Sequence, residues 1–361
     1  MPQQRLFLLV AGYSHGDAIS NEARILRDLF RRRGLESHVV CESCRILPEL
    51  QHDALTLEAF TETVRPNDIA FLQLSIGSAV NDVFRKADCR KVLLYQNITP
   101  AEYFQCIHPG LSASLAWGRR QLIELAGCAE ITLAASTFNA RELEAAGHPP
   151  AALFPLLIDW STLTTECDRA LLSQWNDDKT NILFVGRCAP NKKIEDVLFA
   201  FHFFQKYVEP ESRLIHVGSY AGTEKYHYWL KTLVRKNSMR NVELIGTLTQ
   251  PELNAAYACA NVFLCMSEHE GFCVPLLEAM QHRVPILAFD AGAVAETLGG
   301  AGILVRAKKF DQIAEMMGRI AHDKPFRQAL LEGQDRRLET YKAFDMETRL
   351  LELLAPVLTT H

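Results

Sequence analysis

The sequence contains no apolar run long enough to cross a bilayer, and its first apolar segment, Leu6–Val10, is too short for a signal peptide. It has no strong excess of either charge, because a net charge of −5 provides no field that would attract nucleic acid. The triplet Asp-x-Asp, a common clamp for a divalent metal, does not occur. We therefore expect a cytoplasmic protein that binds no nucleic acid and needs no metal.

The ten cysteines form no recurring pattern. Several lie in or beside apolar segments, which favours reduced thiols in a cytoplasmic protein. Only Cys41 and Cys44 have the spacing of a metal or redox pair, and no second pair accompanies them. A zinc or redox role for this pair is therefore the less favoured alternative.

Short apolar strands alternate with segments of helical period in the first half of the chain. Such alternation predicts a parallel sheet with helices on both faces, that is, an α/β fold. We expect strands at Arg5–Ala11, Ser37–Cys41, Asp68–Leu74, Lys91–Tyr95 and Glu130–Ala134, and helices at Ala18–Arg33, Ala79–Arg85, Ser114–Ala126 and Phe138–Ala146. Gly34 is placed to end the first of these helices.

A second alternation begins at Asn181. We expect strands at Asn181–Val185, Arg213–Val217, Val242–Ile245, Asn261–Cys265 and Pro285–Phe289, and helices at Ile194–Tyr207, Glu224–Lys236, Pro251–Cys259, Phe310–His322, Pro325–Thr340 and Phe344–Leu354. Between the two alternations, Pro149-Pro150 and the polar stretch Asp159–Lys179 show no clear period. A chain of 361 residues with this break is predicted to fold as two domains.

One loop in the second half carries two acidic residues, Glu270 and Glu278, on either side of a predicted helix start. Pro275 suits the first turn of that helix, which Val274 would cap. Helical side chains tilt toward the helix amino terminus, so both carboxylates can face one crevice beside free N–H groups that suit a phosphate. Gly271 would let a ligand approach the backbone. Simple compensation of the helix dipole by acidic residues is the open alternative.

Because carboxylates repel phosphates, this pair is suited to hydroxyl groups at the two ends of a diphosphate, such as a ribose and a sugar. The segment Glu270-Gly-Phe-Cys-Val-Pro-Leu-Leu-Glu278 resembles the E-x7-E signature of retaining glycosyltransferases of family 4, the glycosyl transferases group 1, which have the GT-B fold. The resemblance continues through Arg283–Ala288 and Ala301–Val305, and it covers the C-terminal half more closely than the N-terminal half.

The resemblance implies an α/β fold of GT-B type, with two facing Rossmann-like, doubly wound domains and a donor cleft between them. Residues 1–160 would form the acceptor-side domain and residues 175–340 the donor-side domain, while residues 341–361 would form a helix that crosses back to the first domain. Glu270 would hold sugar hydroxyls and Glu278 the ribose. The other implied donor contacts are Gly271, Phe272, Cys273 and Val274 beside the sugar phosphate, and Gly246 and Leu248 beside the base.

Two basic residues, Arg187 and Lys192, stand between a predicted strand and a predicted helix. A diphosphate leaving group gains negative charge as the glycosidic bond breaks, and two fixed cations can neutralise it without a metal. In the similar family an arginine and a lysine five residues apart do this, and Arg187 and Lys192 match them in register. Lys193 is then a bystander, and two solvated charges are the alternative reading.

Loops of the first domain carry the remaining candidates. Gly16 would let the backbone approach the diphosphate or acceptor, while Asp17 would cap the following helix or, alternatively, orient an acceptor hydroxyl. Gln73 and Gln96 stand where a bacterial subgroup of the similar family has histidines, in segments that read His-Tyr-Ser-Ile-Gly-Ser and His-Asn-Ile-Thr-Pro. A glutamine can bind a sugar hydroxyl but cannot take a proton, so we expect Gln73, Gln96 and Asn97 to influence donor preference.

Two further basic features have open alternatives. His269 lies beside Glu270 and could contact the donor, or it could be an ordinary solvated loop histidine. Four arginines crowd the end of the first helix, where cations favour the helix dipole and where contact with an anionic membrane surface is the alternative. These are Arg27, Arg31, Arg32 and Arg33.

These features together predict a retaining glycosyltransferase that moves a hexose from a nucleotide-diphospho-sugar to an acceptor hydroxyl in bacterial glycan or glycoconjugate synthesis. The acceptor would be a glycan, a lipid-linked molecule or a small molecule, and no cofactor or metal is expected. The location would be cytoplasmic or peripheral to the inner membrane face, and no oligomeric state is predicted. A nucleotide-sugar epimerase is one alternative, although Gln73 and Gln96 offer no acid or base. A non-catalytic sugar-nucleotide-binding subunit is the other.

Overall fold

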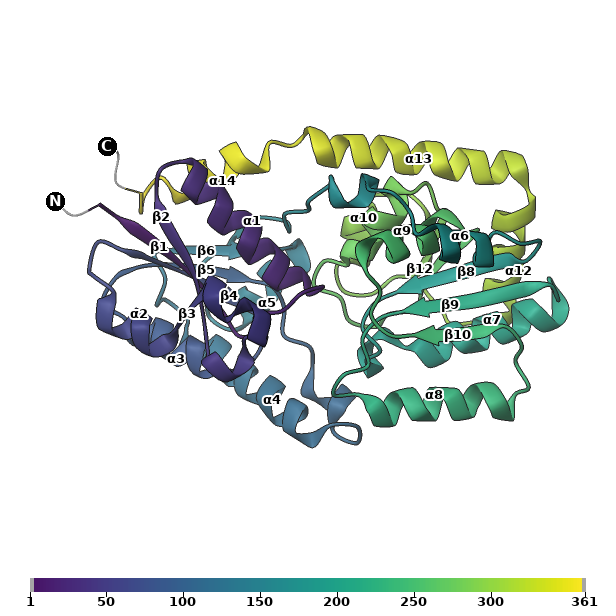
Figure 1. The fold of residues 1–361 in the computed structure, drawn as a ribbon, viewed down its shortest axis with the longest axis horizontal. Helices are drawn as coiled ribbons and strands as arrows, with labels where there is room; N and C mark the ends of the chain where they lie inside the picture. The colour runs from purple at the N-terminus through teal and green to yellow at the C-terminus, as the bar shows by residue number, and fades with distance from the viewer. Residues whose placement is uncertain (1–2, 359–361) are drawn as a thin grey trace. The chain divides into compact units, whose positions relative to one another are not determined.

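The computed structural model describes residues 3–358, which divide into two compact units. The first unit contains the described residues up to Gln105, together with Pro109–Ile158 and the segment that starts at Asp345. The second contains Cys106–His108 and Asp159–Phe344. Each unit is built on one parallel sheet with helices packed around it (Figure 1).

The first unit has a seven-stranded sheet of order β3-β2-β1-β4-β5-β6-β7. Its strands are β1 (Arg5–Val10), β2 (Glu36–Cys41), β3 (Ala54–Thr56), β4 (Ile69–Leu74), β5 (Arg90–Tyr95), β6 (Ile131–Ala134) and β7 (Ala152–Leu153). Its helices are α1 (Ala18–Arg32), α2 (Leu57–Thr63), α3 (Ala79–Lys86), α4 (Pro109–Glu124), α5 (Thr137–Ala145) and α14 (Met346–Leu354). The strand order reverses between β1 and β4, and α/β sheets usually bind ligands at the carboxyl ends of strands beside such a reversal.

Helix α14, at the end of the chain, packs into the core of the first unit. Leu350, Leu354 and Val357 are fully buried there against apolar residues of β1, β4, β5 and β6. Each such side chain stabilises the fold by about 1.5–3 kcal/mol. Arg90 also donates a hydrogen bond to the carbonyl oxygen of Pro356 at 2.8 Å. The segment 345–358 therefore contributes to the core of the first unit.

The second unit has a six-stranded sheet of order β10-β9-β8-β11-β12-β13. Its strands are β8 (Thr180–Val185), β9 (Ser212–Val217), β10 (Val242–Ile245), β11 (Val262–Cys265), β12 (Ile286–Phe289) and β13 (Ile303–Val305). Its helices are α6 (Arg169–Trp175), α7 (Ile194–Tyr207), α8 (Glu224–Lys236), α9 (Gln250–Ala258), α10 (Val274–Gln281), α11 (Val294–Leu298), α12 (Phe310–His322) and α13 (Lys324–Ala343). Here the order reverses between β8 and β11, whose following loops carry the basic and acidic candidates.

Most of the strands and helices expected from the sequence are present, and the differences concern short elements. Helix α6 lies inside the stretch that shows no clear period; Asp168 caps it by accepting a hydrogen bond from the Leu171 N–H at 2.8 Å. The other elements absent from the prediction are β3, α2, β7, α11 and β13, which are too short to show a period. Helix α10 begins at Val274, one residue earlier than expected, so that Cys273 is its N-cap residue in place of Val274.

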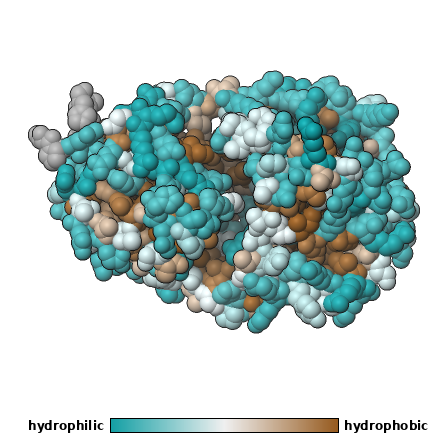
Figure 2. Space-filling view, in the orientation of Figure 1, coloured by the Kyte–Doolittle hydropathy of each residue, from teal (hydrophilic) through white to brown (hydrophobic). Residues whose placement is uncertain are grey.

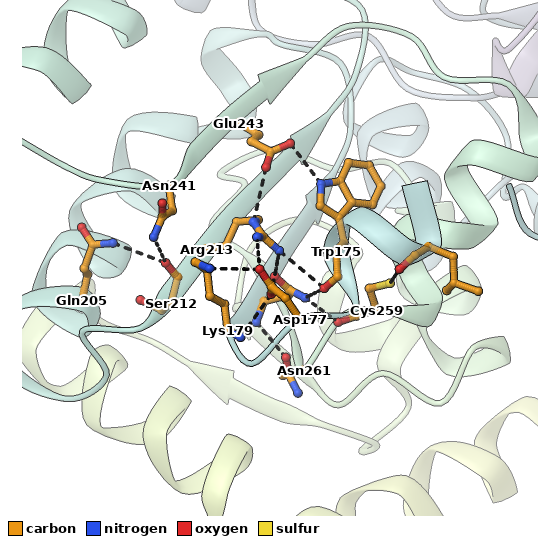
Figure 3. A network of polar contacts seen from close by, with 12 residues as sticks. Trp175, Asp177, Lys179, Gln205, Ser212, Arg213, Asn241, Glu243, Cys259 and Asn261 are labelled. Atoms are coloured by element: carbon orange, nitrogen blue, oxygen red, sulfur yellow. Dashed lines mark hydrogen bonds and ion pairs between the residues drawn. The ribbon is translucent and has the colours of Figure 1, made fainter. Parts of the chain in front are cut away.

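A polar network around Arg213 joins the amino ends of β8, β9 and β10 (Figure 3). Its guanidinium donates to Asp177 Oδ2 at 2.6 Å and forms an ion pair with Glu243 at 3.3 Å. Glu243 also accepts a hydrogen bond from Trp175 Nε1 at 3.1 Å, and Asn181 donates to the Trp175 carbonyl oxygen at 2.8 Å. Ligands bind at the carboxyl ends of parallel strands. Because this network lies at the amino ends, we assign it the structural role of holding α6 against the sheet.

The surface visible in Figure 2 is mostly hydrophilic, with apolar residues gathered over the edge strand β10. A groove of about 370 Å³ lies there, lined by Tyr228, Lys231, Val234, Arg235, Val242 and Leu244. The site residues expected from the sequence are not among its lining residues. No helix within residues 3–358 combines the length and the apolar character that crossing a membrane requires.

Candidate active site

The start of α10 combines a tight backbone turn with a helix amino terminus that no side chain caps. The buried strand β11 leads into a loop that ends at Cys273, whose φ of 76° lies in the left-handed region. This is a strained conformation for a residue other than glycine. No side chain caps the helix at this end, and the first N–H groups of any helix have no acceptor within it. Pro275 follows in the first turn, as its fixed φ favours.

Glu270 and Lys192 form a close ion pair at this turn. Lys192 Nζ lies 2.7 Å from both carboxylate oxygens of Glu270, whose side chain is only 7% exposed. Burial by itself would lower the pKa of Lys192, but the adjacent Glu270 carboxylate outweighs it, and the pKa is raised. The ammonium group therefore stays charged at neutral pH. The structure thus brings together two residues that are 78 positions apart in the sequence and that were expected to act on one donor.

Backbone contacts hold this pair in position from two sides. The Glu268 N–H donates to the Asn191 carbonyl oxygen at 2.9 Å, and the Asn191 amide donates to the His269 carbonyl oxygen at 3.2 Å. The short 3₁₀ turn that contains Lys192 is thereby fixed on the loop that contains Glu270.

Gly292 supports the loop from the other side. Its φ is 57°, and a Cβ atom there would lie 2.4 Å from the Glu270 carbonyl oxygen. The next residue, Ala293, donates its N–H to that same oxygen at 2.9 Å. Only glycine fits this position without a shift of the backbone. Sequence reasoning missed Gly292, because nothing in the local pattern connects it to a loop more than twenty residues earlier.

Glu278 lies further along α10 and makes a separate contact. Its Oε2 accepts a hydrogen bond from the hydroxyl of Tyr257 on α9 at 2.6 Å. Burial raises the pKa of Glu278, and the Tyr257 hydrogen bond opposes this effect only in part. Tyr257 is fully buried and stacks on His282 with ring centroids 5.0 Å apart. Tyr257 therefore orients the carboxylate that was expected to bind the ribose. The spacing of acidic residues in the sequence could not reveal Tyr257 as a partner of Glu278.

The two lysines and the arginine after β8 are separated by the fold. Arg187 is exposed, and its Nη2 donates to the Ala221 carbonyl oxygen at 3.2 Å in the loop after β9. Lys193 lies 3.6 Å from Glu195 and 3.5 Å from Glu268, with which it forms ion pairs. The bystander role of Lys193 and the role of Arg187 at a diphosphate both stay predictions.

The residues expected near the base and the sugar are half-buried or buried. Gly246 follows β10 and faces the ring of Tyr220, which a Cβ atom would approach to 3.3 Å. Tyr220 stacks on His227 with ring centroids 4.3 Å apart. Leu248 is half-buried, and the His269 side chain is buried. His269 is therefore not the solvated loop histidine that the sequence left open.

Gly271 and Val274 in the acidic loop are half-buried, and Phe272 is buried. The Phe272 carbonyl oxygen accepts a hydrogen bond from the Thr297 hydroxyl. This contact joins the acidic loop to α11.

Three candidates of the first unit occupy backbone turns. Asp17 caps α1, since its Oδ2 accepts a hydrogen bond from the Ser20 N–H at 2.8 Å. Gly16 has a φ of 70° and is exposed. Asn97 has a φ of 101°, and its amide donates to Glu142 Oε2 at 2.8 Å. Asp17 thus takes the favoured capping role, and Asn97 is tied to its own unit.

Gln73 and Gln96 are buried and bind a residue that sequence reasoning missed. Both side-chain amides donate to Glu22 Oε2 on α1, Gln73 at 2.6 Å. The other oxygen, Oε1, accepts the Leu157 N–H at 3.0 Å. Burial raises the pKa of Glu22 to about 7, and these three hydrogen bonds oppose the rise. The structure therefore favours a structural role for both glutamines over the sugar contacts expected of them.

A signal for Glu22 was present in the sequence. In the first helix Ile19, Ala23 and Leu26 define the apolar stripe, and Glu22 falls three residues after Ile19 and four before Leu26. A helical period therefore places this carboxylate on the buried face. A charged residue on such a stripe requires hydrogen-bond donors from the neighbouring strands.

Residues 172–336 match a family model described as glycosyl transferases group 1. The matched segment is less than half of the chain. It includes Arg187, Lys192, Glu270 and Glu278, the four residues on which the resemblance rested. The resemblance found in the sequence is therefore confirmed for most of the second unit.

Several curated relatives of the chain are mannosyltransferases. The GDP-mannose-dependent alpha-mannosyltransferase of Mycolicibacterium smegmatis is 32% identical over 182 residues, which are 50% of this chain and 44% of that protein. O-antigen chain mannosyltransferase B of Escherichia coli is 28% identical over 147 residues, 40% of this chain and 38% of that protein. The chain thus spans less than half of the length of these two relatives.

Solved structures of glycosyltransferases share the fold over nearly the whole chain. Anabaena HepE, in complex with UDP and glucose, has a TM-score of 0.77 at 16% identity and covers 98% of this chain and 100% of that chain. Sucrose-phosphate synthase from Thermosynechococcus elongatus has a TM-score of 0.75 at 16% identity, covering 98% and 99%. The expected fold class, two Rossmann-like α/β domains of GT-B type, is confirmed.

Proposed function

We propose that this protein is a retaining glycosyltransferase that moves a hexose from a nucleotide-diphospho-sugar to an acceptor hydroxyl without a metal. The observation that carries the proposal is the Lys192–Glu270 pair at the amino end of α10, with Glu278 on the same helix. A cation and a helix amino terminus suit the phosphates of a sugar diphosphate, and carboxylates suit its hydroxyl groups. The mannosyl relatives make GDP-mannose the first donor to test.

The proposed chemistry follows from where charge develops. As the glycosidic bond breaks, negative charge grows on the departing diphosphate, and a fixed cation stabilises it. Lys192 uses two of its three N–H donors on Glu270 and keeps a third for a phosphate oxygen. Arg187 supplies a second, exposed cation. Glu270 retains lone pairs for sugar hydroxyls while its charge stays compensated by Lys192.

A retaining reaction also suits the residues present. The departing phosphate oxygen can accept the proton of the acceptor hydroxyl, so the protein needs no general base of its own. This agrees with glutamine at positions 73 and 96, where the similar bacterial subgroup has histidine. The acceptor would be a glycan, a lipid-linked molecule or a small molecule in a bacterial glycan or glycoconjugate pathway. Work at the cytoplasmic side of a membrane is consistent with such acceptors.

One observation favours a second candidate function. The side-chain amides of Gln73 and Gln96 donate hydrogen bonds to Glu22. The first unit therefore offers fewer groups for a sugar than the resemblance implied. A protein that binds the sugar nucleotide through its second unit and supports an active partner would still be compatible with this. Turnover separates the two functions, because only the enzyme releases the nucleotide diphosphate.

The test combines ligand binding with turnover. GDP, UDP, GDP-mannose and UDP-glucose are compared by thermal shift, where a ligand at 100 times its Kd adds about 2.7 kcal/mol of stability. Release of nucleotide diphosphate from the stabilising donor is then measured with and without acceptors. For the enzyme we expect Arg187→Ala to lower kcat by about 10²- to 10³-fold. Binding without turnover for every donor and acceptor would favour the non-catalytic function, and no binding of any nucleotide would overturn the proposal.

A further inference from the structure

Two cysteine thiols lie directly beside the Lys192–Glu270 pair. Cys265 ends β11 and Cys273 caps α10, and both are free and buried. One donor atom from each thiol and one from the Glu270 carboxylate lie within 4.8 Å of one another. Seven residues of loop separate the two cysteines, and the fold closes that loop onto itself. This is a convergence that cysteine spacing alone does not show, because it is not a Cys-x-x-Cys pattern.

The distances suit a small tetrahedral cation. In a zinc site with Zn–S of about 2.3 Å and Zn–O of about 2.0 Å, the ligand atoms lie about 3.5–3.8 Å apart. The three donor atoms here need to close by about 1 Å or less to reach that geometry, which side-chain rotation can supply. Thiolate sulfur is the ligand that selects Zn²⁺ over Mg²⁺ or Ca²⁺.

The charges of the neighbourhood also balance. Two thiolates and the Glu270 carboxylate carry three negative charges, which a divalent cation and the Lys192 ammonium offset. Two thiol protons leave to solvent when the metal binds. In the structure Lys192 Nζ lies 2.7 Å from each oxygen of the Glu270 carboxylate. One of these oxygens can bind the cation while the other keeps its contact with Lys192. Lys192 would then orient the carboxylate, as outer contacts of metal ligands commonly do.

We propose that Cys265, Glu270 and Cys273 form a binding site for one thiophilic divalent cation such as Zn²⁺. Because Glu270 is the proposed sugar ligand, occupation of the site withdraws one of its oxygens from the donor. The cation therefore inhibits transfer and is no catalytic cofactor; this consequence rests on the proposed function, whereas binding itself does not.

A hydroxyl group beside the site supports the proposal. Cys265 Sγ lies 3.4 Å from the Ser267 hydroxyl, a contact that can stabilise the thiolate.

The decisive measurement is a titration of the reduced protein with Co²⁺, which reports thiolate ligands by charge-transfer absorption. We expect saturation at one equivalent and displacement of Co²⁺ by Zn²⁺. Cys265→Ser should weaken binding by more than the roughly 10- to 100-fold that loss of an outer contact costs. Cys41→Ser is the matched control, since Cys41 is also buried at a strand end but lies in the first unit. It should leave the titration unchanged.

A second measurement needs no variant. X-ray absorption of the Zn²⁺-loaded parent protein should show two sulfur ligands near 2.3 Å and lighter ligands near 2.0 Å. Inhibition of nucleotide-diphosphate release by Zn²⁺, reversed by a chelator, tests the consequence for transfer. A site without sulfur ligands, or a Co²⁺ spectrum that survives in both Cys265→Ser and Cys273→Ser, overturns the proposal. Bound zinc with two sulfurs but no transferase activity in any condition would retain the site and reject the proposed function.

Discussion

Each unit has a buried carboxylate near the carboxyl ends of its strands, Glu22 in the first unit and Glu270 in the second. The two carboxylates have different kinds of partner. Glu22 in the first unit accepts hydrogen bonds from neutral amides of Gln73, Gln96 and Leu157. Glu270 in the second unit pairs with the Lys192 ammonium. Burial consequently raises the pKa of Glu22 to about 7, whereas in the second unit the Glu270 carboxylate raises the pKa of Lys192.

This difference in partners gives the same α/β architecture two kinds of site. A buried carboxylate without a cation takes up a proton near neutral pH and then acts as a structural hydrogen-bonding group. A cation held by a buried carboxylate can instead stabilise the negative charge that develops on a ligand. The donor chemistry therefore belongs to the second unit, and the cluster around Glu22 belongs to the core of the first.

The largest effect should come from removing the cation of the second cluster. Lys192→Ala leaves Glu270 buried without a partner and removes the proposed stabiliser of the departing diphosphate. We expect kcat/KM to fall by about 10²- to 10³-fold, the usual cost of one such group. Loss of a buried ion-pair partner should also lower the free energy of unfolding by about 3–5 kcal/mol.

Lys193→Ala is the matched control for this change. Its ammonium forms surface ion pairs at 3.5–3.6 Å, which are worth about 1 kcal/mol or less. Kinetics and urea unfolding of both variants make the measurement. Equal losses in the two variants would contradict the special position of Lys192.

The next effect tests the other carboxylate by its dependence on pH. The folded pKa of Glu22 is about 7 and its ordinary value is 4.5, so its contribution to stability is fully present below pH 4.5 and is lost as pH rises through 7. Glu22→Gln should remove this loss, which makes the variant about 3 kcal/mol more stable relative to the parent at pH 8 than at pH 4. The amide can serve the same neighbours after they reorient.

Urea unfolding at several pH values checks this prediction. Glu62→Gln is a suitable control, because that carboxylate is exposed on α2. It should leave the pH dependence of the parent unchanged. If the parent and Glu22→Gln show parallel profiles from pH 4 to 8, the raised pKa of Glu22 is wrong.

The two clusters also show what the sequence could predict. The alternation of strands and helices predicted both sheets, and the E-x7-E spacing predicted which loop would carry the second cluster. The pairing of Lys192 with Glu270 and of Tyr257 with Glu278 depended on how distant segments pack, which no local period encodes. Glu22 was not among the expected site residues, although its helical position lies on the apolar stripe.

A smaller effect is expected at the far end of the second cluster. Glu278→Gln should weaken binding of a nucleoside diphosphate by about 1.5–3 kcal/mol, the range for hydrogen bonds to a charged group. Tyr257→Phe should cause part of this loss, because it removes the hydroxyl that orients Glu278 at 2.6 Å. Calorimetry with GDP and with mannose 1-phosphate, which has no ribose, distinguishes the roles. Equal losses for both ligands would mean that Glu278 supports the loop and does not contact the ribose.

The smallest effect should come from Gln96→His, which restores the histidine of the similar subgroup. Gln96 is 8% exposed and donates to Glu22, so its replacement should act on Glu22 before it acts on any donor. A histidine there can supply a charged N–H to the carboxylate, which would lower the pKa of Glu22 and flatten the pH profile between about 5 and 7. The net change in unfolding free energy should be about 1 kcal/mol, as for most single substitutions. The ranking of donor sugars should stay within about twofold, or 0.4 kcal/mol, of the parent. Competition among several sugars on one nucleotide measures this ranking. A reversed ranking with an unchanged pH profile would place Gln96 at the donor sugar and would return the first unit to the chemistry of transfer.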